Sequence, residues 1–244
     1  MKWCEYPGYW LGVEAIQNYG CRMFTGLGLT LELVIISVGL GAIFGLALAV
    51  LRLYGPKPVA MIVTGYTTFF RGTPLLAQVF LVYYGGGQLR PMLETLGLWS
   101  FFREAFFCAV FTFTLNTAAY QAEVFRGAIQ SVAKGQWEAA EALGMHRVPL
   151  FLKVILPQAL MVALRPLGNE LVIMVKSSAV ASLVTLYDLM GATRLAFARS
   201  FDLSVYFFAA ALYLLIVETI RRVWDMAERR LTDRKSTRLE LQSH

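Results

Sequence analysis

The chain has 244 residues, of which 57% are hydrophobic and 16% are charged, and its mean hydropathy is +0.57. This composition excludes an ordinary soluble domain and indicates an all-α integral membrane protein. The formal net charge is +6. We interpret it as a topology signal and predict no nucleic-acid binding, because basic residues gather at the cytoplasmic ends of membrane helices.

Residues 1–25 combine Lys2 with several aromatic residues, and no apolar stretch there resembles a cleavable signal peptide. Aromatic rings with polar edges favour the membrane interface, so we predict an extracytoplasmic amino-terminal segment. The three cysteines are Cys4, Cys21 and Cys108, and their spacing matches no zinc or redox motif. Cys4 and Cys21 can pair outside the cytoplasm, but we expect free thiols. We predict neither a metal site nor catalytic residues.

Five stretches approach the roughly 20 apolar residues that a membrane-spanning helix needs. They are residues 29–54, 58–84, 102–124, 162–187 and 205–220. The first contains Gly41 and Gly45, a GxxxG pair that predicts close helix packing. Most Lys and Arg residues between and after these spans lie on the side of the carboxyl terminus, which predicts an outside amino terminus and an inside carboxyl terminus.

The stretch GQWEAAEALG, residues 135–144, lies in the longest predicted cytoplasmic loop. Two glycines bracket good helix formers, and Glu138 lies in the first turn, which predicts a helix of two turns. Trp137, Ala140 and Leu143 or Gly144 fall on one side of it. This stripe of mostly small residues is suited to contact with a partner.

The loop resembles the EAA loop of ABC importer permeases. Matching positions are Glu138, Ala139, Ala140, Gly144, Leu156 and Pro157, whereas Val154 replaces the usual isoleucine. The stretches 71–85, 115–144, 155–160 and 165–180 resemble the polar amino-acid branch, which includes histidine, glutamine, arginine and opine permeases. We therefore predict a permease transmembrane domain over residues 26–231, with a type I ABC importer fold.

This resemblance implies a function and a set of partners. In the family two permease subunits, identical or homologous, form the pathway in the bacterial inner membrane. Two ATP-binding subunits hydrolyse ATP, and a periplasmic amino-acid-binding protein delivers the substrate. The chain itself is then no enzyme and binds no cofactor.

The resemblance makes the segment from Glu138 to Gly144 the coupling helix, which docks in the ATPase. Glu138 would meet a basic residue of the partner, and Ala139 and Ala140 would permit close approach. Gly144 would let the chain turn away. The alternative interpretation is a solvated connecting helix.

Charged and polar residues within the spans predict a substrate pathway, because such groups are costly in lipid. Asn169 and Lys176 share one helical face, and Glu170 and Ser177 share the next. They form either a lining for a zwitterionic amino acid or an internal Glu170–Lys176 network.

Other polar features have simpler interpretations. The RGTP break, with Gly72 and Pro74, is either a second lining region or a simple junction between two helices. Glu123 with Arg126, and Glu218 with Arg221 and Arg222, have the spacing of structural ion pairs.

We therefore predict the permease subunit of an ATP-driven importer of polar, cationic amino acids. The alternative is an ATP-independent amino-acid carrier or channel, which leaves the loop pattern unexplained. An intramembrane enzyme is disfavoured, because His146 is the only histidine before the terminus and no nucleophile neighbours it. Residues 187–202 predict an amphipathic helix at the outer rim, and residues 232–244 a tail that is disordered or foreign to the protein.

Overall fold

The computed structural model describes the backbone of residues 6–240, and all of its regular elements there are helical. In chain order they are α1 (Tyr6–Leu11), α2 (Glu14–Tyr54), α3 (Lys57–Gly72), α4 (Leu75–Gln88), α5 (Arg90–Thr95), α6 (Trp99–Phe102), α7 (Ala105–Gln130), α8 (Lys134–Ala142), α9 (Arg147–Leu150), the π-helix η2 (Phe151–Ile155), α10 (Leu156–Ser177), the 3₁₀-helix η3 (Ser178–Leu183), α11 (Leu189–Ser200) and α12 (Ser204–Glu240). The predicted all-α class is confirmed.

The first long helix, α2, has 41 residues. At 1.5 Å per residue it is about 61 Å long, roughly twice the hydrocarbon thickness of a bilayer. Because α2 begins at Glu14, no break separates the predicted amino-terminal segment 1–25 from the first span. The predicted boundary at residue 26 does not coincide with a break in the helix, and the extracytoplasmic location of residues 1–25 stays a prediction.

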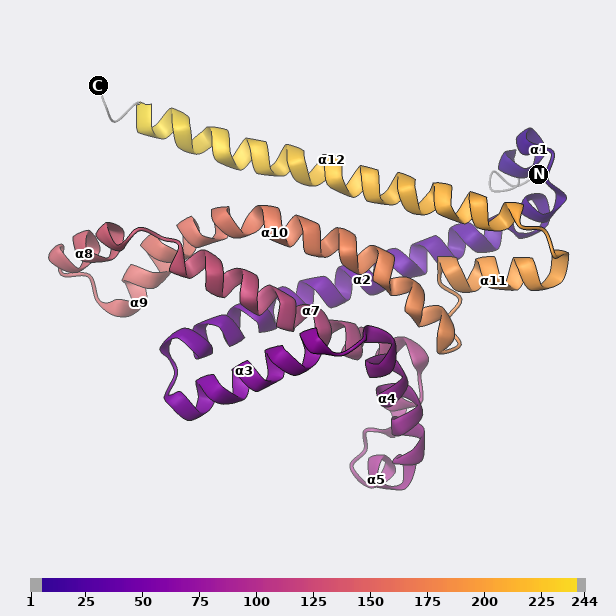
Figure 1. Ribbon diagram of the computed structural model, residues 1–244, viewed down its shortest axis with the longest axis horizontal. Helices are drawn as coiled ribbons and strands as arrows, with labels where there is room; N and C mark the ends of the chain where they lie inside the picture. Colours follow the sequence, from indigo (N-terminus) through magenta and orange to yellow (C-terminus); the bar gives the residue numbers. More distant parts are fainter. Residues whose placement is uncertain (1–5, 241–244) are drawn as a thin grey trace.

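Three continuous helical stretches of the described residues are long and apolar enough to cross a membrane: Glu14–Tyr54, Arg147–Leu183 and Ser204–Leu231. The predicted second span, residues 58–84, is not one helix. It is divided into α3 and α4, which run in different directions in Figure 1. Pro74 disfavours helical backbone at Thr73, whose φ of −114° and ψ of 147° are extended.

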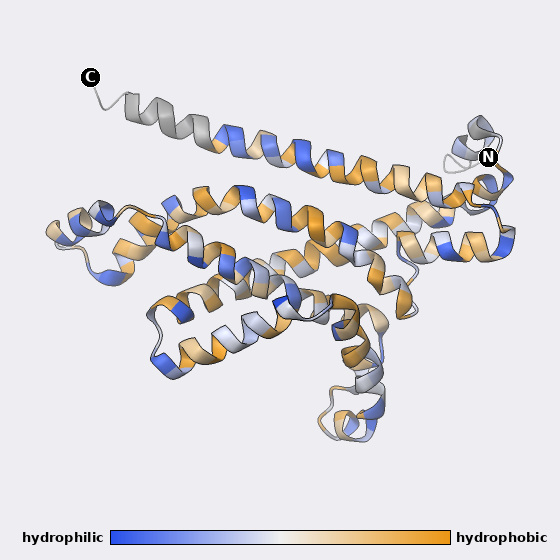
Figure 2. Ribbon diagram, in the orientation of Figure 1, coloured by the Kyte–Doolittle hydropathy of each residue, from blue (hydrophilic) through white to orange (hydrophobic). Residues whose placement is uncertain are grey.

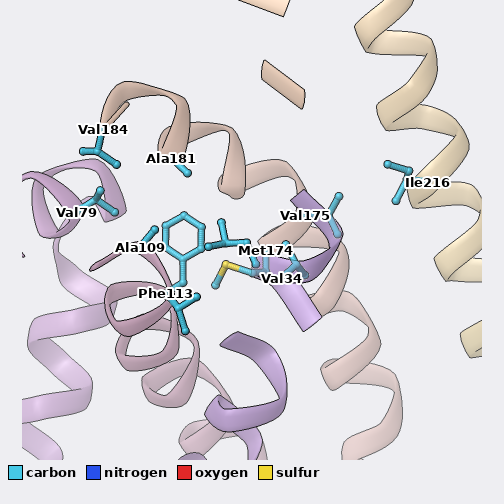
Figure 3. Close-up of a cluster of buried hydrophobic side chains, with 11 residues drawn as sticks. Val34, Val79, Ala109, Phe113, Met174, Val175, Ala181, Val184 and Ile216 are labelled. Atoms are coloured by element: carbon cyan, nitrogen blue, oxygen red, sulfur yellow. The ribbon is translucent and has the colours of Figure 1, made fainter. Parts of the chain in front are cut away.

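Helix α7 lies at the centre of the packing. It has 26 residues and corresponds to the predicted third span. Its fully buried Phe113 packs in one cluster with Val34 of α2, Val79 of α4 and Met174 of α10 (Figure 3). This cluster holds the break between α3 and α4 against the longer helices.

Two small residues allow α2 to approach α7 closely. A Cβ on Gly41 would lie 2.4 Å from the Cγ2 of Thr117, and one on Gly45 would lie 3.0 Å from the Cβ of Gln121. Both distances are too short for a side chain to fit without a shift of the neighbour. The predicted packing role of this GxxxG pair is confirmed.

The two ends of the molecule differ. Figure 1 places α8 and α9 at one end, near the carboxyl terminus, and α1 and α11 at the other, near the amino terminus. The predicted outer helix 187–202 is α11, which Asp188 caps by accepting a hydrogen bond from the Gly191 N–H at 2.9 Å.

Cys21, at the end with α1 and α11, is disulfide-bonded, whereas Cys108 is a buried free thiol. The expectation of free thiols throughout was therefore wrong for Cys21. Cys4 lies outside the described residues.

In the coloured part of α12, hydrophobic residues after Ser204 give way to more hydrophilic ones toward Leu231 (Figure 2). Its backbone stays helical to Glu240, where a disordered tail was expected from residue 232. Residues 241–244 lie outside the described part.

Candidate coupling and transport sites

The predicted two-turn helix is α8, and a glycine ends it as expected. Gly144 has a φ of +73°, a left-handed conformation that side chains disfavour. Its N–H donates to the Glu141 carbonyl at 2.9 Å, and the Met145 N–H donates to the Ala140 carbonyl at 3.1 Å. These two bonds form a Schellman motif, which satisfies carbonyl groups at the end of α8 and turns the chain away.

One face of α8 packs against this chain. Ala140 is only 4% exposed and lies in a cluster with Ala49, Leu150 and Ile155. The Trp137 ring lies 6.4 Å from the ring of Tyr54, between centroids. The stripe of Trp137 and Ala140 therefore anchors α8 to its own subunit, in contrast to the prediction that Ala140 meets a partner.

The opposite face of α8 is open. Glu138, Ala139 and Ala142 are exposed, and Leu143 is 82% exposed. A large apolar side chain beside two alanines and a carboxylate is a surface to which a partner can dock closely. This surface, with Gly144 at its end, is the candidate coupling site.

The RGTP break is stabilised by two amides. Gln78 Nε2 donates to the carbonyl oxygens of Phe70, at 3.0 Å, and Thr73, at 3.1 Å. Asn116 Nδ2 donates to the Phe70 carbonyl at 3.1 Å and to Gln78 Oε1 at 2.9 Å. Backbone groups freed by Pro74 thus have partners inside the protein, as a break at membrane depth requires.

Glu123 is the centre of an ion cluster. It contacts Arg52 of α2, accepts from Arg126 at 2.9 Å and lies 4.0 Å from Arg71 of α3. The predicted pair with Arg126 is confirmed. No helical spacing predicts the contacts of Arg52 and Arg71 with Glu123, because these two arginines lie on other helices.

The other predicted ion pair is also present. Glu218 contacts Arg221 at 2.8 Å and Arg222 at 2.7 Å, all on α12. Both arginine side chains are largely exposed, so these contacts stabilise the helix only weakly.

A cleft of about 390 Å³ lies between α7 and α10. Arg71, Tyr120, Glu123, Pro166 and Glu170 are among the residues that line it. The guanidinium carbon of Arg71 lies 5.4 Å from the centroid of the Tyr120 ring, which is within the range of a cation–π contact. The cleft therefore offers two carboxylates, one aromatic ring and one resident cation.

The predicted pathway residues of α10 are divided between two environments. Glu170 is 7% exposed and accepts a hydrogen bond from Thr117 at 3.2 Å. Asn169 and Lys176 share an exposed face, and Ser177 is half-buried. Because six residues turn an α-helix by about 240°, Glu170 and Lys176 point away from each other. The internal Glu170–Lys176 network is therefore not formed.

Gly72 and Pro74 are exposed beside Arg71. They lie in the break between α3 and α4 but are not among the residues that line the cleft. Arg71, Tyr120 and Glu123, which the sequence did not single out for the pathway, take that position with Glu170.

Residues 37–233 match the family described as binding-protein-dependent transport system inner membrane component. The chain belongs to this family. It is therefore a membrane-spanning transport permease rather than an enzyme, and in such importers the ATP is used by partner ATPase subunits while the permease binds no cofactor.

Curated relatives cover nearly the whole permease. It is 37% identical over 219 residues to the nopaline transport system permease protein NocM of Agrobacterium fabrum, covering 89% of this chain and 91% of the relative. It is also 37% identical to the arginine ABC transporter permease protein ArtM of Haemophilus influenzae, covering 82% and 88% of the two chains. The predicted family resemblance is confirmed.

Solved structures agree with the fold. A chain from the crystal structure of an amino acid ABC transporter with histidines matches with a TM-score of 0.76 and 33% identity, covering 87% of the permease and 95% of that chain. A chain of the inward-facing MetNI methionine ABC transporter matches with a TM-score of 0.73, and its 19% identity supports the fold alone. The predicted ABC importer fold is thereby confirmed.

Proposed function

We propose that this permease couples ATP hydrolysis by a partner ATPase to the import of a cationic amino acid or an opine. The observation that carries the proposal is the exposed face of α8, formed by Glu138, Ala139, Ala142 and Leu143 and ended by Gly144. The inner face of α8 is packed on its own subunit. A movement of the ATPase that displaces α8 would therefore be transmitted to the cluster that includes Ala49 of α2 and Ala159 and Ala163 of α10.

The relatives and the cleft support the proposed substrate class. The relatives' names assign them nopaline, octopine and arginine. Glu123 and Glu170 place two carboxylates on the cleft between α7 and α10. Carboxylates and an aromatic ring suit a guanidinium or ammonium group.

The exposed polar face of α10 supports a second permease subunit. Polar and charged side chains within a membrane helix are costly when they face lipid. Lys176 and Asn169 are both exposed on a helix long and apolar enough to span the membrane. We infer that this face meets a second copy or a homologue across the route of the substrate, and that Ser177, Gly72 and Pro74 also belong to the pathway.

The disulfide of Cys21 supports the orientation. Disulfides persist in oxidising compartments such as the bacterial periplasm. Cys21 lies at the end that carries α1 and α11, and α8 lies at the other. We infer that the amino terminus faces the periplasm, where a binding protein delivers substrate, and that α8 and the carboxyl terminus face the cytoplasm.

The test is co-purification of the tagged permease from membranes with its ATPase. Glu138→Arg and Gly144→Trp alter the exposed end of α8, whereas Glu94→Arg makes the same charge change on α5, far from it. We expect an ATPase subunit with the wild type and with Glu94→Arg, and its loss from the two α8 variants. An intact permease that never brings an ATPase would contradict the proposal and favour an ATP-independent carrier or channel.

A further inference from the structure

Arg71 is a surplus cation in the cluster around Glu123. One oxygen of Glu123, Oε1, contacts Arg52, and the other, Oε2, accepts from Arg126 at 2.9 Å. The Arg71 Nη1 lies 4.0 Å from Oε1, the longest of the three contacts. Glu123 is therefore neutralised without Arg71, and the Arg71 charge is held only loosely by it.

The Arg71 side chain occupies the cleft itself. It is 45% exposed, lies over the Tyr120 ring at 5.4 Å, and lines the cleft together with Glu123 and Glu170. The main chain of Arg71 is held separately, because the Tyr120 hydroxyl donates to its carbonyl oxygen at 3.4 Å. The guanidinium can therefore leave the cleft while the end of α3 stays in place.

We propose that the guanidinium of Arg71 occupies the subsite for the cationic group of the substrate, and that the substrate displaces it on binding. The proposal rests on the proposed function and adds a specificity-determining residue to it. The surroundings are those that a substrate guanidinium requires: an aromatic face and two carboxylates. Arg71 supplies the same group from within the chain.

The internal cation has two consequences. It places a positive charge on the cleft that the buried Glu170 also lines, where an uncompensated carboxylate is costly in the empty transporter. It also competes with the substrate, because an internal group that fills the subsite about nine-tenths of the time raises the apparent Kd about tenfold. An analogue with a neutral side chain does not use this subsite, so its affinity does not increase when Arg71 is removed.

The experiment measures the binding of labelled arginine and of citrulline, its neutral analogue, to the purified complex of permease and ATPase in detergent, without binding protein. The variants are Arg71→Ala, Arg71→Lys and Arg71→Ala combined with Tyr120→Leu. We expect Arg71→Ala to bind arginine about tenfold more tightly than the wild type. Citrulline binding should stay unchanged, Arg71→Lys should resemble the wild type, and loss of the Tyr120 ring should reverse the gain.

Several outcomes overturn the proposal. It fails if Arg71→Ala binds arginine no more tightly, if citrulline affinity changes equally, or if arginine binds to none of the complexes. Co-purification of the ATPase with Arg71→Ala shows that the variant is folded. If the ATPase co-purifies but these shifts are absent, the role of Arg71 is refuted and the ATP-coupled function stands.

Discussion

Gln78 joins the break between α3 and α4 to the central helix α7. Its amide nitrogen donates to the carbonyls of Phe70 and Thr73, and its oxygen accepts from Asn116. Its side chain is buried, so water does not replace these bonds when they are lost. The geometry of the break between α3 and α4 therefore depends on one glutamine.

We predict that Gln78→Leu lowers the free energy of unfolding by about 1–3 kcal/mol, because buried carbonyls lose their donor. Gln136→Leu, on the exposed surface of α8, should change it by no more than about 0.5 kcal/mol. The measurement is the temperature at which the buried Cys108 thiol reacts with a maleimide dye in detergent. Equal midpoints for the two variants would refute the role of Gln78.

Among single residues, the local ion pairs could be predicted from the sequence. Glu123 with Arg126, and Glu218 with Arg221 and Arg222, meet because three or four residues make one helical turn. Arg52 and Arg71 join Glu123 from other helices, and no periodicity indicates such contacts. The position of Arg71 in the cleft could therefore not be predicted from the sequence.

At the scale of elements, α2 approaches α7 closely at Thr117, whose hydroxyl donates to Glu170 of α10. Gly41 and Gly45 permit this approach, since a Cβ at either would press on α7. Gly39 lies on the same helix, but a Cβ there meets nothing within 4 Å. Substitutions at Gly41 and Gly45 therefore test the packing of α2 on α7, whereas a substitution at Gly39 tests only helix propensity.

We predict that Gly41→Ala destabilises the permease by about 1–3 kcal/mol through overpacking against Thr117. Gly39→Ala should be neutral or stabilising by up to about 1 kcal/mol, because alanine favours the helix. Thermal unfolding followed by Cys108 labelling compares the two. Destabilisation of equal size in both variants would show that α2 and α7 are not in tight contact there.

For helix α8, the sequence pattern predicts the position and the end of the helix but not the surface against which it packs. Its position and its stop at Gly144 follow from local propensity, and both could be predicted. The sequence also places Trp137 and Ala140 on one stripe, but a stripe does not tell which neighbour it packs against. Here it packs against the chain's own core, and the opposite face stays exposed.

For the whole molecule, the separation of α8 from α11 predicts that the two lie on opposite sides of the membrane. Cysteines introduced one at a time at Leu143 and Phe201, both at least 80% exposed, report the two ends in a Cys108→Ser background, and labelling of that background alone is subtracted. A membrane-impermeant maleimide should label Phe201→Cys in spheroplasts and Leu143→Cys only after permeabilisation. Labelling of Leu143→Cys in intact spheroplasts would reverse the orientation.

The most direct measurement is uptake of labelled arginine into proteoliposomes that contain the permease, its co-purified ATPase and the binding protein. We predict uptake only with ATP on the ATPase side, and loss of uptake in Ala139→Arg, which places a bulky charge on the exposed face of α8. Glu94→Arg should transport like the wild type, since α5 lies far from α8. Uptake that proceeds without ATP, or that Ala139→Arg leaves intact, would contradict coupling through this helix.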